Sequence, residues 1–237
     1  MKTLITICAR GGSKGILGKN IKHINGIPLI NYTINSAILF SNLFESDIAI
    51  STDDIKIAEE CKKMGLKSDY IRPLHLSTDT AGKIDTILDL LLYEEKLRSI
   101  KYDHILDLDV TSPLRSIEDL KQAFDLLHQD EKALNIFSVN NASKNPYFNM
   151  VEQKEDGYYE LSKKGNFLTR QEANLVYELN ASFYIYKRTF FDSENRKVIN
   201  ERSLIYQMKH ICFDLDHPID FEFMSYLIEN NKLDFKF

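Results

Sequence analysis

The chain has 237 residues, of which 43% are hydrophobic and 27% are charged, and its formal net charge is −5 at pH 7. This length favours one α/β domain with a substantial core, so we expect residues 1–237 to form a single domain. The acidic balance argues against broad nucleic-acid binding, which needs a basic face. It leaves room for a small anionic ligand, which needs only local positive charge.

Apolar spacing predicts strands and helices in alternation along the chain. Strands are expected at residues 3–9, 47–52, 68–73, 103–110, 134–141 and 180–187. Helices are expected at residues 28–42, 53–65, 83–99, 116–130 and 221–231, the fourth with Ser116 as its N-cap. This alternation predicts an α/β fold with a mostly parallel sheet and helices on both faces.

Residues 142–179 interrupt the alternation with polar, aromatic and turn-rich sequence that contains only short β-like pieces. We interpret this segment as an insertion in the single domain. Insertions of this type often serve binding or dimerisation.

Three scattered cysteines and the start of the chain bear on the cellular compartment in which the protein is expected. Cys8, Cys61 and Cys212 form no metal-type or redox-type pair, which favours a reducing environment and packed thiols. No signal-peptide pattern precedes the first strand, and no apolar run is long enough to cross a bilayer. We therefore expect a cytoplasmic protein.

The stretch ITICARGGSKGILGKN, residues 5–20, places a glycine-rich loop directly after the first strand. It is not a Walker loop, because Asn20 stands where a hydroxyl is required and Ser13 where the first glycine is required. It is not the dinucleotide fingerprint either, because Gly11 and Gly12 are adjacent. The loop is therefore of another kind.

The same loop carries three cations, Arg10, Lys14 and Lys19. They follow a sheet strand, where open α/β sheets bind ligands, and the glycines let backbone amides turn toward an anion. This combination suits a triphosphate that will lose pyrophosphate. The alternative is a solvated glycine turn with incidental lysines.

A second candidate site is the late stretch CFDLDHPIDFE, residues 212–222. Asp214 and Asp216 alternate with apolar residues, so an extended chain presents both carboxylates on one side. Two such oxygen ligands suit a Mg²⁺ ion that also binds substrate phosphates. Asp220 could be a third ligand, but we expect it to cap the final helix.

A third candidate is ILDLDVTSPLR, residues 105–115, in which a strand carries two carboxylates. Asp109 follows the strand and should point into the ligand cleft, where it could hold a metal or a sugar hydroxyl. Asp107 lies on the same face and is either functional or structural.

The order of these motifs resembles that of the acylneuraminate cytidylyltransferases, which include the CMP-sialic acid synthetases and relatives acting on legionaminic and pseudaminic acids. The resemblance runs from about residue 3 to 225 and includes ARGGSKGILGKN, STDD, TSPLR, TRQ, ELNASFYIY and FDLDHPIDFE. It implies a Rossmann-like nucleotidyltransferase sheet and a homodimer into which the inserted segment reaches. It also implies an enzyme that uses Mg²⁺ to join CMP from CTP to the anomeric hydroxyl of a nine-carbon 2-keto acid sugar, releasing pyrophosphate.

The resemblance also implies roles for individual residues. CTP would be surrounded by Arg10, Gly12, Ser13, Lys14, Lys19, Asn20, Arg72 and Lys83, with the loop lysines drawing charge from the phosphates. Asp109, Arg170, Gln171 and Asn180 would face the sugar, and Asp214 and Asp216 would hold Mg²⁺. The guanidinium of Arg170 suits the sugar carboxylate. Either Asp109 or a metal-bound water or hydroxyl would take the proton from the sugar.

Some positions depart from the family pattern. Asp109 stands where many members have glutamine, and Lys83 lies where many have a serine near the base. Tyr147 and Phe148 occur where a lysine is expected near the sugar. These changes indicate a sugar other than N-acetylneuraminate, such as a deaminated or di-N-acyl relative. They leave open a nucleotidyltransferase of the same fold for a Kdo-type acid, a sugar 1-phosphate or another nucleotide, and a binding module without chemistry.

Overall fold

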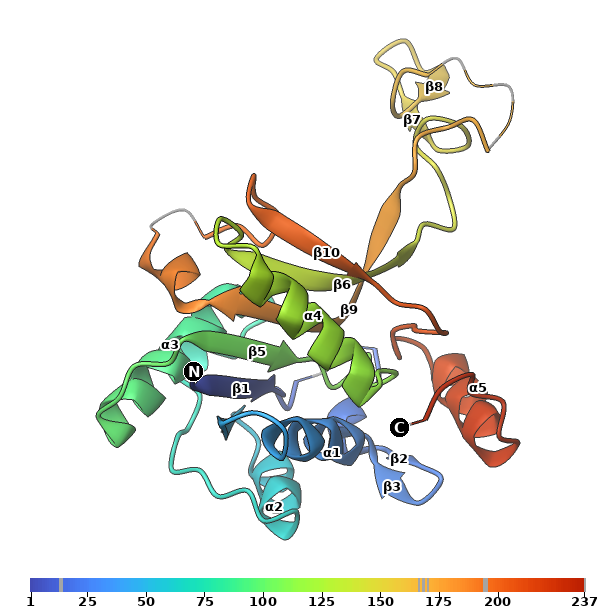
Figure 1. Cartoon of the computed structure of the whole chain (residues 1–237). Helices are drawn as coiled ribbons and strands as arrows, with labels where there is room; N and C mark the ends of the chain where they lie inside the picture. Colours follow the sequence, from blue (N-terminus) through green and yellow to red (C-terminus); the bar gives the residue numbers. More distant parts are fainter. Residues whose placement is uncertain (13–14, 166, 168, 170, 194–195, 237) are drawn as a thin grey trace.

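The computed structural model describes residues 1–12, 15–165, 167, 169, 171–193 and 196–236. In this part of the chain, a six-stranded sheet has the order β10-β6-β9-β5-β1-β4 (Figure 1). Its strands are β1 (Thr3–Cys8), β4 (Ser46–Ser51), β5 (His104–Leu108), β6 (Asn135–Asn141), β9 (Tyr177–Lys187) and β10 (Ser203–Gln207). β9 runs antiparallel to β5 and β6, whereas the other neighbouring strands are parallel. The prediction of a mostly parallel sheet is confirmed.

Helices cover both faces of this sheet. They are α1 (Leu29–Ser41), α2 (Ile55–Lys63), α3 (Lys83–Arg98), α4 (Ile117–Gln129) and α5 (Pro218–Glu229). Short 3-10 turns lie at Lys19–Ile21, Leu74–Leu76 and Arg188–Asp192. The strands β2 (His23–Ile24) and β3 (Ile27–Pro28) form a small hairpin before α1.

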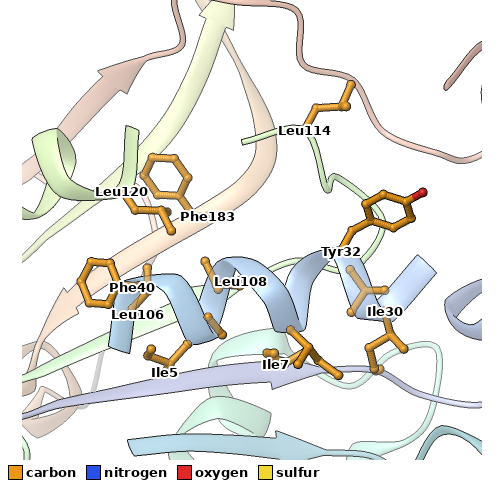
Figure 2. Close-up of a cluster of buried hydrophobic side chains, with 14 of the residues drawn as sticks. Ile5, Ile7, Ile30, Tyr32, Phe40, Leu106, Leu108, Leu114, Leu120 and Phe183 are labelled. Carbon is orange, nitrogen blue, oxygen red and sulfur yellow. The ribbon is translucent and has the colours of Figure 1, made fainter. Parts of the chain in front are cut away.

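Alternation along the strands divides the core into two layers. Leu4 and Ile105 point toward α3, while Ile5 and Leu106 point toward α1 and α4. In Figure 2, Phe40 of α1 packs with Ile5 and Leu106 on that second face. Each such buried side chain contributes about 1.5–3 kcal/mol of burial free energy. The two cores hold the strand ends in fixed positions, and these ends build the site described below.

Most predicted elements are confirmed, including the N-cap at Ser116, whose side chain accepts a hydrogen bond from the N–H of Asp119. The final helix begins at Pro218, earlier than predicted, because proline is well suited to the first helical position. Asp220 caps this helix as predicted, accepting a hydrogen bond from the N–H of His217.

One strand prediction was wrong, and one strand of the main sheet was missed. Residues 68–73 form no strand in the structure. The side chains of Tyr70 and Arg72 are buried in alternation, as they would be in a strand. However, the backbone N–H of Arg72 donates to the carbonyl of Thr52, which lies just beyond the end of β4, and not to a residue of the strand itself. The edge strand β10 was not predicted, because SLIYQ is too short to give a clear periodic signal.

The predicted insertion contains a two-stranded hairpin, β7 (Val151–Gln153) and β8 (Tyr159–Leu161). The hairpin projects from the sheet beyond the end of β6 and the start of β9 (Figure 1). We call residues 142–176, between these two strands, the projecting segment. Within the described residues, no helix has the length and apolar character needed to span a bilayer.

Candidate functional site

A polar cleft lies at the carboxyl ends of β1, β4 and β5, where open parallel sheets bind ligands. It has two adjoining lobes, of about 420 and 230 Å³, which share Cys8, Arg10 and Asp109 as lining residues. The larger lobe is also lined by Gly15, Lys19, Asn20, Val110, Thr111 and Asp216. The smaller lobe is also lined by Arg72, Leu76, Thr78, Asp79, Ala81, Lys83 and Thr86. The cleft therefore brings together motifs from the beginning, middle and end of the chain.

The glycine loop is shaped by close packing against the turn after β4. A side chain on Gly11 would place its Cβ 2.8 Å from Cβ of Asp54, so the chain can come this close only with glycine. Gly18 has φ 66° and begins the 3-10 turn at Lys19–Ile21. Asn20 is buried and its Nδ2 donates to the carbonyl of Arg10 at 2.9 Å, which ties the two ends of the loop together.

The described cations of this loop each face a carboxylate. Arg10 Nη1 lies 2.7 Å from Asp79 Oδ1, and Lys19 Nζ lies 3.0 Å from Asp216 Oδ1. Gly12 is exposed at the loop surface. The predicted loop residues Ser13 and Lys14 lie outside the described residues. Arg10 and Lys19 are thus placed at the cleft, as the sequence suggested.

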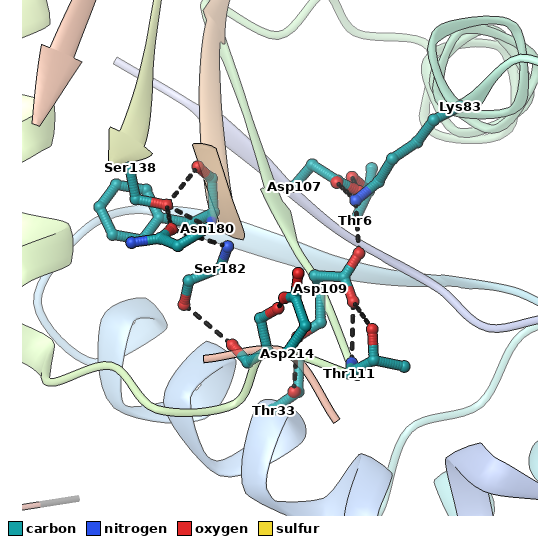
Figure 3. Close-up of polar contacts among 12 residues, drawn as sticks. Thr6, Thr33, Lys83, Asp107, Asp109, Thr111, Ser138, Asn180, Ser182 and Asp214 are labelled. Atoms are coloured by element: carbon teal, nitrogen blue, oxygen red, sulfur yellow. Dashed lines mark hydrogen bonds and ion pairs between the residues drawn. The ribbon is translucent and has the colours of Figure 1, made fainter. Parts of the chain in front are cut away.

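Lys83, the first residue of α3, reaches across the strand ends to two carboxylates (Figure 3). Its Nζ lies 2.8 Å from Oδ2 of both Asp107 and Asp109, and 5.1 Å from the ring centre of Tyr184. Asp107 is fully buried and also accepts a hydrogen bond from Thr6 at 2.9 Å. Burial alone would lower the pKa of Lys83, but the two carboxylates raise it well above its usual value. Lys83 is therefore a permanent cation that joins β1, β5 and α3.

Asp109 is held in one orientation beside the cleft. Its Oδ1 accepts hydrogen bonds from the N–H and Oγ1 of Thr111, both at 2.8 Å. Burial acts to raise the pKa of Asp109, but Lys83 and Thr111 outweigh it and lower the pKa to about 2. Asp109 is thus an ionised hydrogen-bond acceptor, and such a low pKa makes it a poor proton acceptor at neutral pH.

Asp214 and Asp216 are exposed on either side of fully buried Leu215. The N–H of Leu215 donates to the carbonyl of Thr111 at 2.8 Å, and Ser112 Oγ donates to Asp214. This anchoring places the late acidic motif against the loop that follows β5. Although the residue as a whole is exposed, its carboxyl group loses water beside Ser112, and this desolvation, with repulsion from Asp109 and Asp216, raises the pKa of Asp214 to about 6.

These carboxylates fit a magnesium ion by their chemistry. They supply hard oxygen ligands, and the repulsion among them is what a divalent cation relieves. Among the described residues, no three His, Cys, Asp or Glu side chains form a closed metal-binding group. Magnesium bound by Asp214 and Asp216 would therefore take its remaining ligands from phosphate oxygens and water.

Arg72 lines the smaller lobe but is itself deeply buried. Its Nε donates to Ser51 Oγ at 2.9 Å, and its Nη2 donates to the carbonyl of Ser51 at 2.6 Å. The end of β4 therefore fixes the guanidinium at the wall of this lobe. Its predicted contact with the base stays a prediction.

The predicted sugar-binding residues are more dispersed. Asn180 is buried, with its Oδ1 accepting from Ser138 Oγ at 2.6 Å and its Nδ2 donating to Asn140 at 2.9 Å. Gln171 is exposed in the projecting segment, and Arg170 lies outside the described residues. Neither Asn180 nor Gln171 is among the described residues that line the two lobes. Of the described members of this set, only Asp109 lines the cleft.

Sequence reasoning missed Arg115, which organises the loop after β5. This guanidinium is 1% exposed, and its Nη2 donates to the carbonyls of Asp109 and of Ser112, the latter at 2.6 Å. Its Nε donates to Ser182 at 2.9 Å. Burial lowers the pKa of Arg115 to about 10, so it stays charged at neutral pH. The TSPLR motif was the available signal, because an arginine directly after an apolar turn can bind backbone carbonyls.

Cys8 also lines both lobes, although it was predicted to pack in the core. Burial, followed by the charge of Asp107, raises the pKa of its thiol to about 12. The thiol is therefore protonated at neutral pH and unsuited to nucleophilic work.

Cations on a glycine loop, carboxylates across the cleft and a protonated thiol suit direct transfer of a phosphoryl-type group from one ligand to another, without a covalent enzyme intermediate. The fold and the site together define an α/β protein of the nucleotidyltransferase class. The match of residues 4–235 to the cytidylyltransferase family shows that this chain belongs to that family.

Individual relatives match over nearly their whole length. The chain is 41% identical over 234 residues to post-translational flagellin modification protein B of Campylobacter coli, covering 98% of this chain and 97% of that one. It is 38% identical over 231 residues to a CMP-N,N'-diacetyllegionaminic acid synthase of Campylobacter jejuni, covering 97% of this chain and 96% of the relative.

A solved structure shares the fold. The structure of CMP:2-keto-3-deoxy-manno-octonic acid synthetase complexed with CTP matches with a TM-score of 0.69 and 16% identity. The match covers 98% of this chain and 100% of that one. The Rossmann-like nucleotidyltransferase sheet expected from the sequence is confirmed.

Proposed function

We propose that this enzyme transfers CMP from CTP to the anomeric hydroxyl of a nine-carbon 2-keto acid sugar and releases pyrophosphate. The observation that carries the proposal is the cleft itself, where the cations Arg10 and Lys19 of the glycine loop lie beside the Asp214–Asp216 segment. Membership of the cytidylyltransferase family supports CTP as the donor. The likeness to a CMP-N,N'-diacetyllegionaminic acid synthase supports a nonulosonic acid as the acceptor.

The triphosphate fits the larger lobe. Lys19 would contact phosphate oxygens there, and Arg10 stands where the two lobes meet. Charge neutralisation by these side chains lowers the barrier for an oxygen nucleophile that approaches the shielded α-phosphate. Ser13 and Lys14, in the same loop, are proposed to add further contacts.

The base fits the smaller lobe, whose wall includes Arg72 and Leu76. The guanidinium of Arg72 is fixed by Ser51 before any ligand binds, so little side-chain freedom would be lost on binding. Lys83, also predicted to bind the nucleotide, faces this lobe while neutralising Asp107 and Asp109.

Magnesium is the proposed cofactor, held by Asp214 and Asp216. When bound, it would withdraw charge from the phosphates and help to orient them for in-line displacement. The ammonium group of Lys19 contacts Asp216. Lys19 and the late acidic motif would therefore act on the same phosphate groups.

Asp109 would accept a hydrogen bond from a sugar hydroxyl in the larger lobe. Its three existing hydrogen bonds, from Lys83 and Thr111, fix the direction of the remaining acceptor site. Arg170 and Gln171 belong in sequence to the predicted insertion, residues 142–179, and we propose that they reach the sugar through a homodimer, from the partner subunit. A cytoplasmic location, where nucleoside triphosphates are available, is part of this proposal.

A second candidate is the same reaction with a Kdo-type octulosonate, favoured by Asp109 where many relatives of the acylneuraminate type have glutamine. The presence of Arg170 in the predicted insertion favours an acidic sugar over a sugar 1-phosphate in either case.

The test is pyrophosphate release, with the four ribonucleoside triphosphates crossed against N-acetylneuraminate, legionaminate, pseudaminate and Kdo. We expect turnover only with CTP, one nine-carbon acid and Mg²⁺.

Asp214→Asn should lower kcat by at least about 100-fold with the fold intact, because it removes a metal ligand. Glu222→Gln, on the exposed surface of α5, is the matched control and should leave the rate unchanged. Turnover with Kdo alone would contradict the proposed nine-carbon acceptor and support the second candidate, and normal activity of Asp214→Asn would contradict the metal assignment.

A further inference from the structure

Three carboxylates contact described groups of the glycine loop that suit phosphate. The pairs are Gly11 N–H with Asp53 Oδ1 at 2.9 Å, Arg10 Nη1 with Asp79 Oδ1 at 2.7 Å, and Lys19 Nζ with Asp216 Oδ1 at 3.0 Å. These acids come from three separate loops, after β4, before α3 and before α5. A carboxylate and a phosphate oxygen offer the same kind of acceptor to a cation or an N–H group.

Two of these acids have a role that accounts for their place. Asp216 belongs to the proposed magnesium pair. Asp53 lies two residues after the end of β4 and accepts the N–H of Gly11, which fixes the glycine loop to the sheet. Asp79 lies in the loop before α3 and lines the smaller lobe, and neither the proposed chemistry nor the sheet accounts for it.

The pair of Arg10 and Asp79 is placed for exchange with a ligand. Both side chains line the smaller lobe, with 32% of the Arg10 side chain and 40% of the Asp79 side chain exposed. An ion pair this exposed adds little to stability and opens easily. A triphosphate brings more negative charge than one carboxylate. Its phosphate oxygens can also accept two parallel hydrogen bonds from one guanidinium.

We propose that Asp79 is a positioning residue that stands in for phosphate at Arg10, and this inference rests on the proposed function. Before the nucleotide binds, Asp79 holds the guanidinium at the meeting point of the two lobes. It gives Arg10 up to the nucleotide and takes it back when pyrophosphate leaves. Asp79 thereby weakens the binding of both CTP and pyrophosphate, and it favours release of the product.

The experiment measures the binding of CTP and of inorganic pyrophosphate, each with Mg²⁺, to the full-length wild type and to Asp79→Asn. The amide keeps the shape and removes the competing charge, so both dissociation constants should fall by about two- to five-fold, the range expected for an exposed ion pair. The inhibition constant of pyrophosphate in the steady-state assay should fall by the same factor. Asp79→Glu, which keeps the charge, should bind like the wild type.

Asp69→Asn is the matched control, because Asp69 is exposed and lies outside the residues that line the two lobes. It should leave both constants unchanged and so exclude an effect of net charge alone. Weaker or unaltered binding by Asp79→Asn would overturn the inference, since a permanent Arg10–Asp79 pair would instead support the wall of the cleft. Failure of the wild type to bind CTP would refute the proposed function itself, whereas the sign of the change for pyrophosphate decides the role of Asp79.

Discussion

The ammonium group of Lys83 lies 2.8 Å from the buried carboxylate of Asp107 and 2.8 Å from the cleft carboxylate of Asp109. The positive charge of Lys83, close to both carboxylates, offsets their mutual repulsion in this partly buried site. Thr6 and Thr111 complete the hydrogen bonding of this group. The orientation of Asp109 in the cleft therefore depends on a residue that need not touch the substrate.

We predict that Lys83→Met lowers the free energy of unfolding by about 3 kcal/mol at pH 7, because it leaves the fully buried Asp107 without its cation. The double variant Lys83→Met with Asp107→Asn should recover a large part of this loss. Chemical denaturation of the three proteins measures both effects. Equal stability of Lys83→Met and the wild type would show that the ion pair contributes nothing net.

The pH dependence of this loss follows from Asp109. Its pKa is lowered to about 2 in the folded protein from its usual 3.8, so its stabilising contribution is present above pH 4 and disappears as the pH falls toward 2. Removal of Lys83 takes away the main cause of that lowering. The stability difference between the wild type and Lys83→Met should thus be largest near neutral pH and shrink below pH 4.

At the scale of the elements, the helices and the central strands could be predicted because each carries a clear apolar period over many residues. The capping of α4 by Ser116 was equally visible. The antiparallel placement of β9 between β5 and β6 could not be predicted, because the order of strands in a sheet is set by contacts distant in sequence. For the same reason the glycine loop and the acidic motif were recognisable separately, while the pairing of Arg10 with Asp79 was not.

One strained position in β9 was also invisible to pattern reasoning. Ala181 has φ 56°, a left-handed conformation that costs a residue with a Cβ about 1–2 kcal/mol. The register between β6 and β9 shifts near this point, between Phe137 and Val139. Asn180 and Ser182 are both buried here, and Asn180 Oδ1 accepts hydrogen bonds from Ser138 Oγ and from the N–H of Ser182.

We predict that Ala181→Gly raises the free energy of unfolding by about 0.5–1 kcal/mol, because relief of strain exceeds the extra chain entropy that glycine loses. Ala181→Val should lower it, since a β-branched residue tolerates positive φ poorly. The control is Ala49→Gly in the regular strand β4, which should be destabilising. A destabilised Ala181→Gly variant would mean that the methyl group packs more favourably than the strain costs.

At the scale of the whole molecule, the hairpin β7–β8 has two chemically different faces. Val151 pairs with Leu161, and Tyr159 lies on the same face, with these three side chains 60%, 37% and 64% exposed. Glu152 and Glu160 face each other on the opposite side. An isolated two-stranded hairpin is marginally stable in water, so an exposed apolar face of this type is typical of a surface that another protein covers.

We predict that the protein is a homodimer and that this apolar face is part of the interface, which would carry the projecting segment toward the partner's cleft. Val151→Lys with Leu161→Lys should convert the dimer to a monomer, because two charges would have to be buried without partners. Glu152→Lys with Glu160→Lys changes the opposite face by the same number of positions and should leave the dimer intact. Sedimentation velocity distinguishes the two species.

If the segment also brings Arg170 and Gln171 to the partner's sugar, the monomeric variant should still bind CTP while its KM for the sugar rises at least about 10-fold. A monomeric wild type, or a monomeric variant with an unchanged KM for the sugar, would show that each chain forms its sugar site alone.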